Sequence, residues 1–129
     1  MNILGVSAGF HDAAVTLINQ HGDILFAGHS ERYSKQKNDA DISLDLLNEI
    51  DMSTVDTIAY YERPLYKQLR QWYSGQGIEW NKLTTTQILK QQLGADRISG
   101  KTIKSYNHHL CHAAAGFQTS TFDQAAVVV

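Results

Sequence analysis

The chain has 129 residues, with 11 Lys and Arg against 13 Asp and Glu, and a formal net charge of −2. This balance excludes a basic nucleic-acid-binding protein held by phosphate contacts. A highly charged disordered tail is also excluded, because 43% of the residues are hydrophobic and 19% are charged. The length is typical of one domain that buries its own core.

The cellular compartment follows from three features. The single cysteine, Cys111, excludes a disulfide framework and is typical of a reducing environment. The longest apolar run is far shorter than the ~20 residues of a membrane-spanning helix. Residues 1–6 lack the basic segment that opens a signal peptide. We therefore expect a cytoplasmic protein that binds neither membranes nor nucleic acids.

Three predicted strands open the chain, at residues 3–6, 13–18 and 24–27. A polar, glycine-containing turn joins the second to the third, so this part of the sheet is expected to be antiparallel. The hydrophobic period then becomes helical, and residues 42–50 place four aliphatic side chains on one face.

A strand at residues 55–61 and two helices are expected next. Pro64 suits the first turn of a helix whose inward face would carry Leu65, Leu69 and Trp72. Thr84 can cap a second helix that ends at Gly94. The aromatic residues Trp72, Trp80 and Tyr106 are interpreted as packing residues.

The C-terminal part predicts a short strand at residues 103–106, an alanine-rich helix at 108–117 and a buried strand at 125–129 (AAVVV). The whole order, β-β-β-α-β-α-α-β-α-β, indicates an α/β fold with a mixed sheet. Because a domain rarely stops within a core strand, we expect the chain to be a fragment of a longer protein.

The link between the first two strands, residues 9–13 (GFHDA), is a candidate site. Gly9 allows a sharp turn close to a ligand, and His11 beside Asp12 could act as a general base near neutral pH. A solvent-exposed turn is the alternative. Residues 31–39 (ERYSKQKND) could bind an anion; a solvated surface loop is the alternative. The cations of that segment are Arg32, Lys35 and Lys37.

Residues 108–112 (HHLCH) are the most specific local signal. On a helix His108 and His112 share one face, which allows them to share a metal ion. The pair His109 and His112 remains geometrically possible, and Cys111 is interpreted as a small packing residue. A third ligand, typically a carboxylate, is needed, and none stands out in the chain. Ordinary polar histidines at a helix start are the alternative.

One further residue follows the strand at 55–61. Arg63 could face a ligand at the end of that strand. An ion pair with Glu62 or Asp56 is the simpler interpretation.

Three segments together resemble the O-carbamoyltransferases, the family of nodulation-factor and antibiotic-tailoring enzymes. Residues 3–14 (ILGVSAGFHDAA) are similar to the family's opening segment. Residues 31–39 resemble its Glu-Arg-aromatic-Ser-Arg-x-Lys-x-Asp segment, with Lys35 in place of the usual arginine. Residues 107–114 (NHHLCHAA) resemble its His-His-x-x-His-Ala-Ala segment. The segments occur in the family's order and span essentially the whole chain.

The resemblance implies a fold and a reaction. Residues 1–129 would be the N-terminal carbamoyl-transfer domain, truncated at its C-terminal end, with the first half-domain of the ribonuclease-H-like, actin-like ATPase fold. The remainder of the polypeptide would make carbamoyl-adenylate from carbamoyl phosphate and ATP. The N-terminal part would pass the carbamoyl group to the hydroxyl of a small-molecule acceptor, with a divalent, iron-type metal.

The resemblance also assigns roles to residues. His108 and His112 become metal ligands, and His11 lies at the reacting carbamoyl group. Candidate contacts to the anionic parts of the adenylate or carbamoyl phosphate are Lys35, Lys37, Arg32 and Asp12. The family's next metal ligand is an aspartate beyond residue 129, so the fragment alone is expected to be inactive.

Two other function classes remain open. The first is an actin-like sugar or acetate kinase, which does not need His108 with His112. The second is a non-catalytic nucleotide-binding assembly module, which would tolerate mutation of His11. Metal affinity and the use of carbamoyl phosphate separate these alternatives. The acceptor and the oligomeric state stay open.

Overall fold

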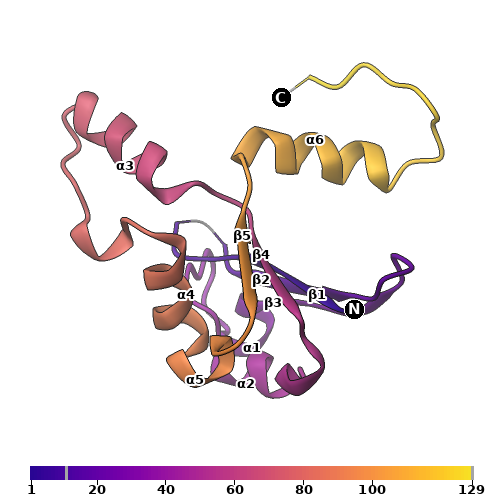
Figure 1. Cartoon of the computed structure of the whole chain (residues 1–129). Helices are drawn as coiled ribbons and strands as arrows, with labels where there is room; N and C mark the ends of the chain where they lie inside the picture. The colour runs from indigo at the N-terminus through magenta and orange to yellow at the C-terminus, as the bar shows by residue number, and fades with distance from the viewer. Residues whose placement is uncertain (11, 129) are drawn as a thin grey trace.

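Five strands form one mixed sheet in the computed structural model, which describes residues 1–10 and 12–128 (Figure 1). The spatial order is β3-β2-β1-β4-β5. The strands are β1 (Ile3–Ser7), β2 (Ala14–Ile18), β3 (Ile24–His29), β4 (Thr57–Tyr60) and β5 (Thr102–Ser105). β1, β2 and β3 pair antiparallel, and β4 and β5 continue the sheet parallel to β1. The predicted α/β class, mixed sheet and antiparallel opening are confirmed.

The strand register brings distant parts of the chain to one edge of the sheet. Val6 pairs with Tyr60, and Tyr60 pairs with Ser105. Ala14 pairs with both Ser7 and His29. β1, β3, β4 and β5 therefore all end at the same edge, which we call the C-terminal edge. The segments that follow these four strands carry the candidate site residues.

Helices and 3₁₀ turns connect the strands. They are α1 (Ser30–Ser34), α2 (Leu44–Asn48), η1 (Met52–Thr54), α3 (Pro64–Tyr73), η2 (Trp80–Lys82), α4 (Thr85–Leu93), α5 (Ala95–Ile98) and α6 (His108–Gln118). α1 corrects the expectation of a simple loop after β3. It forms because Ser30 is buried, with its hydroxyl donating to Asp41 O and accepting from Ser43 N.

The core lies on the sheet face that α2 and α4 cover. The strands contribute alternate residues to it, such as Leu4 and Val6, as the two-residue period of a strand requires. The helix face predicted for residues 42–50 is buried, through Ile42, Leu46, Leu47 and Ile50, and α4 buries Ile88, Leu89 and Leu93. α6 starts at the end of β5 and runs above the C-terminal edge (Figure 1).

The predicted inward face of α3 is wrong. Leu65, Leu69 and Trp72 are 54%, 50% and 62% exposed, whereas Gln68 is buried. α3 is held through its polar side instead, because the Gln68 side-chain carbonyl accepts a hydrogen bond from Glu79 N. The apolar stripe therefore faces outward. Trp80 and Tyr106, also interpreted as packing residues, are 71% and 41% exposed.

The predicted strand at residues 125–129 is also wrong for its described part. Residues 125–128 have no strand conformation, and Val128 is 96% exposed; Val129 lies outside the described residues. A β-branched run forms a strand only where a neighbouring strand supplies hydrogen bonds. Figure 1 shows this segment running beyond α6, away from the sheet.

The N-terminus of α4 provides a stability prediction. Thr84 forms a capping box with Gln87, in which the Thr84 hydroxyl accepts from Gln87 N and the Gln87 side chain accepts from Thr84 N. Thr84→Ala removes this cap and should lower the free energy of opening α4 by about 0.5–2 kcal/mol. Hydrogen exchange of the α4 amides measures the change. Thr86→Ala, inside the helix and exposed, is the matched control and should have no such effect.

Candidate functional site

A histidine pair stands at the start of α6. Asn107 is the N-cap, and its side chain accepts a hydrogen bond from His109 N, which fixes where the helix begins. His108 and His112 consequently share one helical face. Their Nε2 atoms lie 2.9 Å apart, and their rings are nearly perpendicular at 83°. The helical spacing correctly predicted this pair, and His112 is paired with His108 rather than with His109.

The two ring nitrogens are hydrogen-bonded to each other, so one donates and the other accepts. Nitrogens that bind one metal at about 2.0–2.1 Å lie about 3 Å apart at the right angle of an octahedral site and about 3.4 Å apart in a tetrahedral one, so the spacing of this pair suits the octahedral arrangement. Within residues 1–10 and 12–128, however, no cluster of three or more His, Cys, Asp or Glu side chains could hold a metal. The described residues therefore offer two nitrogen donors here, fewer than a metal site needs.

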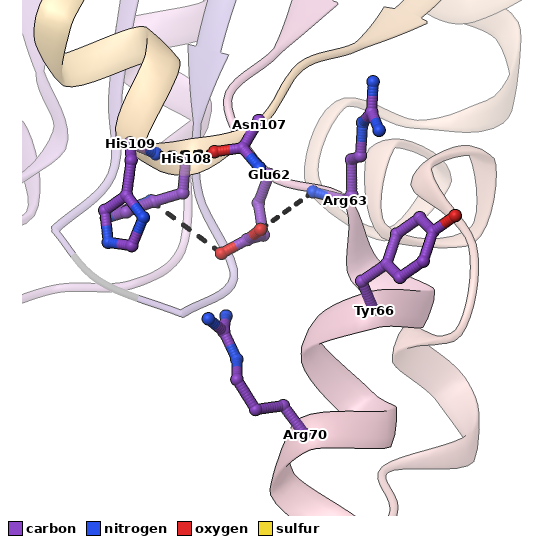
Figure 2. A pocket seen from close by; sticks show the side chains of 7 residues that line it. All are labelled: Glu62, Arg63, Tyr66, Arg70, Asn107, His108 and His109. Carbon is purple, nitrogen blue, oxygen red and sulfur yellow. Dashed lines mark hydrogen bonds and ion pairs between the residues drawn. The ribbon is translucent and has the colours of Figure 1, made fainter.

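A buried carboxylate lies behind His108. The Glu62 side chain is 8% exposed, and its Oε2 lies 3.8 Å from His108 Nδ1 (Figure 2). Its Oε1 accepts a hydrogen bond from Arg63 N. A carboxylate on the Nδ1 side leaves the opposite nitrogen, Nε2, for a metal, which is how outer carboxylates orient metal-binding histidines.

Glu62 was considered from the sequence only as an ion-pair partner of Arg63. Between these two described residues the side chains form no ion pair, and the Arg63 contact is made by its backbone N–H. The available signal was the position of Glu62, two residues beyond β4. Polar residues just after the strands of an α/β sheet often line its ligand site.

A pocket of about 380 Å³ opens between α3 and the start of α6 (Figure 2). It is lined by Glu62, Arg63, Tyr66, Arg70, Asn107, His108 and His109. Arg70 extends from α3 toward the Glu62 carboxylate in this view. The pocket therefore combines two imidazoles, a buried carboxylate and the guanidinium group of Arg70, which suits a polar, oxygen-rich ligand.

Tyr61 packs against the same histidine. Its ring centroid lies 5.3 Å from that of His108. Burial, with the nearby Glu62 charge acting in the same direction, raises the pKa of Tyr61 to about 12. The Tyr61 phenol consequently stays neutral further into the alkaline range than an ordinary tyrosine.

This raised pKa predicts a loss of stability in alkali. Between the ordinary tyrosine pKa of about 10 and the folded pKa of about 12, the unfolded chain loses its proton first, so stability falls as pH rises. Tyr61→Phe should therefore show a smaller drop in melting temperature between about pH 8 and about pH 11. Tyr73→Phe, at a 91% exposed position, should behave as wild type. An unchanged drop in Tyr61→Phe would contradict the prediction.

The loop between β1 and β2 meets the segment after α1. Gly9 N donates to Ala40 O, and Ala13 N donates to Asp39 O, each at 2.7 Å. Gly9 has φ +85°, so it provides the turn expected from the sequence. Asp12 is exposed, and His11 lies outside the described residues.

The three predicted anion-binding cations are gathered but stand apart from the histidines. Arg32, Lys35 and Lys37 line one shallow pocket of about 330 Å³. This pocket shares no lining residue with the pocket at His108. Lys35 Nζ donates to Arg32 O, so one of the three cationic groups already binds the backbone.

Comparison with known proteins finds a relative that matches almost the whole chain. The chain is 32% identical over 152 aligned residues to the uncharacterized protein sll1178 of Synechocystis sp.. The alignment covers 98% of this chain and 25% of the relative, so the chain spans about a quarter of that protein's length. No protein-family model matches the chain. Among the described residues, no helix is long and apolar enough to cross a membrane.

Proposed function

We propose that this chain is the N-terminal carbamoyl-transfer part of an O-carbamoyltransferase. The enzyme would transfer a carbamoyl group from carbamoyl-adenylate, made from carbamoyl phosphate and ATP, to a substrate hydroxyl. The observation that carries the proposal is the pair His108 and His112, with Nε2 atoms 2.9 Å apart and Glu62 behind His108. Use of both donor substrates is consistent with a cytoplasmic location.

The topology supports the same proposal. The three segments that resemble the family follow or overlap the ends of β1, β3 and β5. The strand register places these ends at the same end of the sheet, although β3 and β5 are its two outer strands and their motifs lie in separate pockets. Three antiparallel strands followed by two parallel β-α units also support the ribonuclease-H-like, actin-like half-domain.

The proposed reaction is an acyl transfer. The acceptor oxygen attacks the carbonyl carbon of the adenylate, a new C–O bond forms, the bond to the phosphate oxygen breaks, and AMP leaves. The acceptor hydroxyl loses its proton to a base, a role for which His11 is suited. A bound divalent metal supplies polarisation of the carbonyl oxygen. His108 and His112 would hold this metal, and Glu62 would keep the His108 ring oriented.

The test uses the full-length protein with radiolabelled carbamoyl phosphate, ATP and a panel of polyhydroxyl acceptors. The expected result is a labelled carbamate ester whose formation stops when a chelator removes the metal. His109→Ala should retain transfer, and the double variant His108→Ala/His112→Ala should not. ATP-dependent phosphorylation of an acceptor without use of carbamoyl phosphate would establish the kinase alternative instead.

A further inference from the structure

A second pocket adjoins the histidine site and is not explained by the proposed chemistry. It encloses about 580 Å³ between the turn at Phe10, α3 and the segment that leads into η2. It shares Glu62, Arg70 and His108 with the first pocket. A ligand that reacts at His108 can therefore extend into it.

Two lysines from different elements converge on Phe10 in this pocket. Lys67 Nζ of α3 lies 3.6 Å from the Phe10 ring centroid, and Lys82 Nζ of η2 lies 5.3 Å from it. An aromatic face attracts a cation, which fixes both ammonium groups at the pocket wall. Arg70 adds a third cation to the lining.

The pocket lining carries three cationic side chains, Lys67, Arg70 and Lys82, against the two carboxylates of Glu62 and Glu79. Lys82 pairs with Glu79 at 2.7 Å, and Glu62 is engaged by Arg63 N and His108. Lys67 and Arg70 form no ion pair with any residue in the described part of the chain. Burial lowers the pKa of Lys67, Glu62 and Glu79 oppose this, and Arg70 and Lys82 lower it further. An anion that contacts Lys67 and Arg70 together would favour their charged forms.

The walls of the pocket are fixed by a buried amide. Gln68 is 1% exposed, and its side-chain oxygen accepts a hydrogen bond from Glu79 N at 2.8 Å. This bond ties the middle of α3 to the segment that carries Lys82. Lys67 and Lys82 therefore line the same pocket, because this hydrogen bond holds their two segments together. Gln71 also lines it, and its buried side-chain oxygen has no partner among the described residues, so it can accept from a ligand hydroxyl.

We propose that the pocket around Phe10, Lys67, Arg70 and Lys82 binds an acidic group, a phosphate or a carboxylate, of the compound that reacts beside His108. The anion-binding property stands on this geometry, whereas the identity of the reacting compound rests on the proposed function. Two sources carry such a group: the phosphate of the adenylate donor, and an acidic substituent on the hydroxyl acceptor.

The first experiment titrates inorganic phosphate into the full-length protein by calorimetry, after treatment with a chelator. Lys67→Gln and Arg70→Gln should each weaken phosphate binding about tenfold or more, the effect of losing one charge-assisted hydrogen bond. Lys90→Gln, on the exposed side of α4, is the matched control and should leave the affinity unchanged. Circular dichroism checks that each variant is folded. Equal phosphate affinity in wild type, Lys67→Gln and Arg70→Gln would overturn the proposal.

The second experiment separates the two sources, using AMP for the donor and glucose 6-phosphate for a phosphorylated hydroxyl acceptor. If the pocket serves the donor, Lys67→Gln weakens AMP binding. If it serves the acceptor, Lys67→Gln weakens glucose 6-phosphate binding and leaves AMP binding intact. Phosphate binding that depends on Lys67 without any carbamoyl transfer would refute the proposed function but keep the site. Transfer that is unaffected by Lys67→Gln and Arg70→Gln would remove the site but keep the function.

Discussion

Replacing His108 or His112 by alanine is expected to abolish metal binding by the full-length protein. Each substitution removes one of two nitrogen donors that lie 2.9 Å apart, so the proposed site loses a directly coordinating ligand. The loss of affinity should exceed the 10–100-fold that follows removal of an outer-shell partner. Metal analysis and competition with a chelator measure it. His109→Ala changes a neighbouring imidazole outside the pair and should keep the metal.

Glu62→Gln is expected to weaken metal binding less than the histidine substitutions do. The carboxylate lies 3.8 Å from His108 Nδ1 and acts on the metal only through the imidazole. Its loss should therefore lower metal affinity by about 10–100-fold rather than abolish binding. Equal effects of Glu62→Gln and His108→Ala would instead make Glu62 a direct ligand. Full metal retention in both His108→Ala and His112→Ala would show that the histidines are structural.

Leu46→Ala is expected to cause the largest loss of stability. Leu46 of α2 is fully buried and packs directly against Gly28 of β3, where an added Cβ would overlap Leu46 Cδ1. Removing the leucine leaves a cavity and should cost about 2–5 kcal/mol. Gly28→Ala should overpack the same contact and cost about 1–3 kcal/mol. Hydrogen exchange of the β2 and β3 amides measures both changes.

The double variant Gly28→Ala/Leu46→Ala tests whether the two positions share one space. The new methyl group partly fills the cavity that the leucine leaves, so the combined cost should be smaller than the sum of the single costs. Leu44→Ala, at a 66% exposed position of the same helix, is the control and should change stability little. Strict additivity of Gly28→Ala and Leu46→Ala would contradict this packing.

Local sequence patterns predicted where the helices and strands lie better than they predicted what those helices and strands pack against. Short apolar runs identified β1 and β2, Thr84 identified the start of α4, and the alanine-rich run identified α6, because these signals are contained within a few residues. The stripe of α3 was recognised, but its direction depends on the distant contact between Gln68 and Glu79. The valines at residues 127–128 carry strand propensity, yet a strand also requires a partner.

The residues of the candidate site also differ in this way: some follow from local spacing, and others depend on contacts between distant parts of the chain. The pair His108 and His112 follows from helical spacing alone. Glu62 lies beside the histidine pair only because β4 and β5 are adjacent parallel strands. No local pattern around residue 62 predicts this pairing. The convergence of Lys67 and Lys82 on Phe10 likewise depends on how α3 and η2 return to the first turn.

The position of β4 beside β1 has a consequence for the order of synthesis. β1, β2 and β3 can pair as soon as they leave the ribosome, because short turns join them. The other edge of β1 must wait for residues 57–60, since Ile3 pairs with Thr57. Throughout that interval the nascent chain exposes an open strand edge beside the apolar side chains of Leu4 and Val6. An open edge beside apolar side chains favours pairing with other chains, so the emerging chain is exposed to misassembly until β4 has been translated.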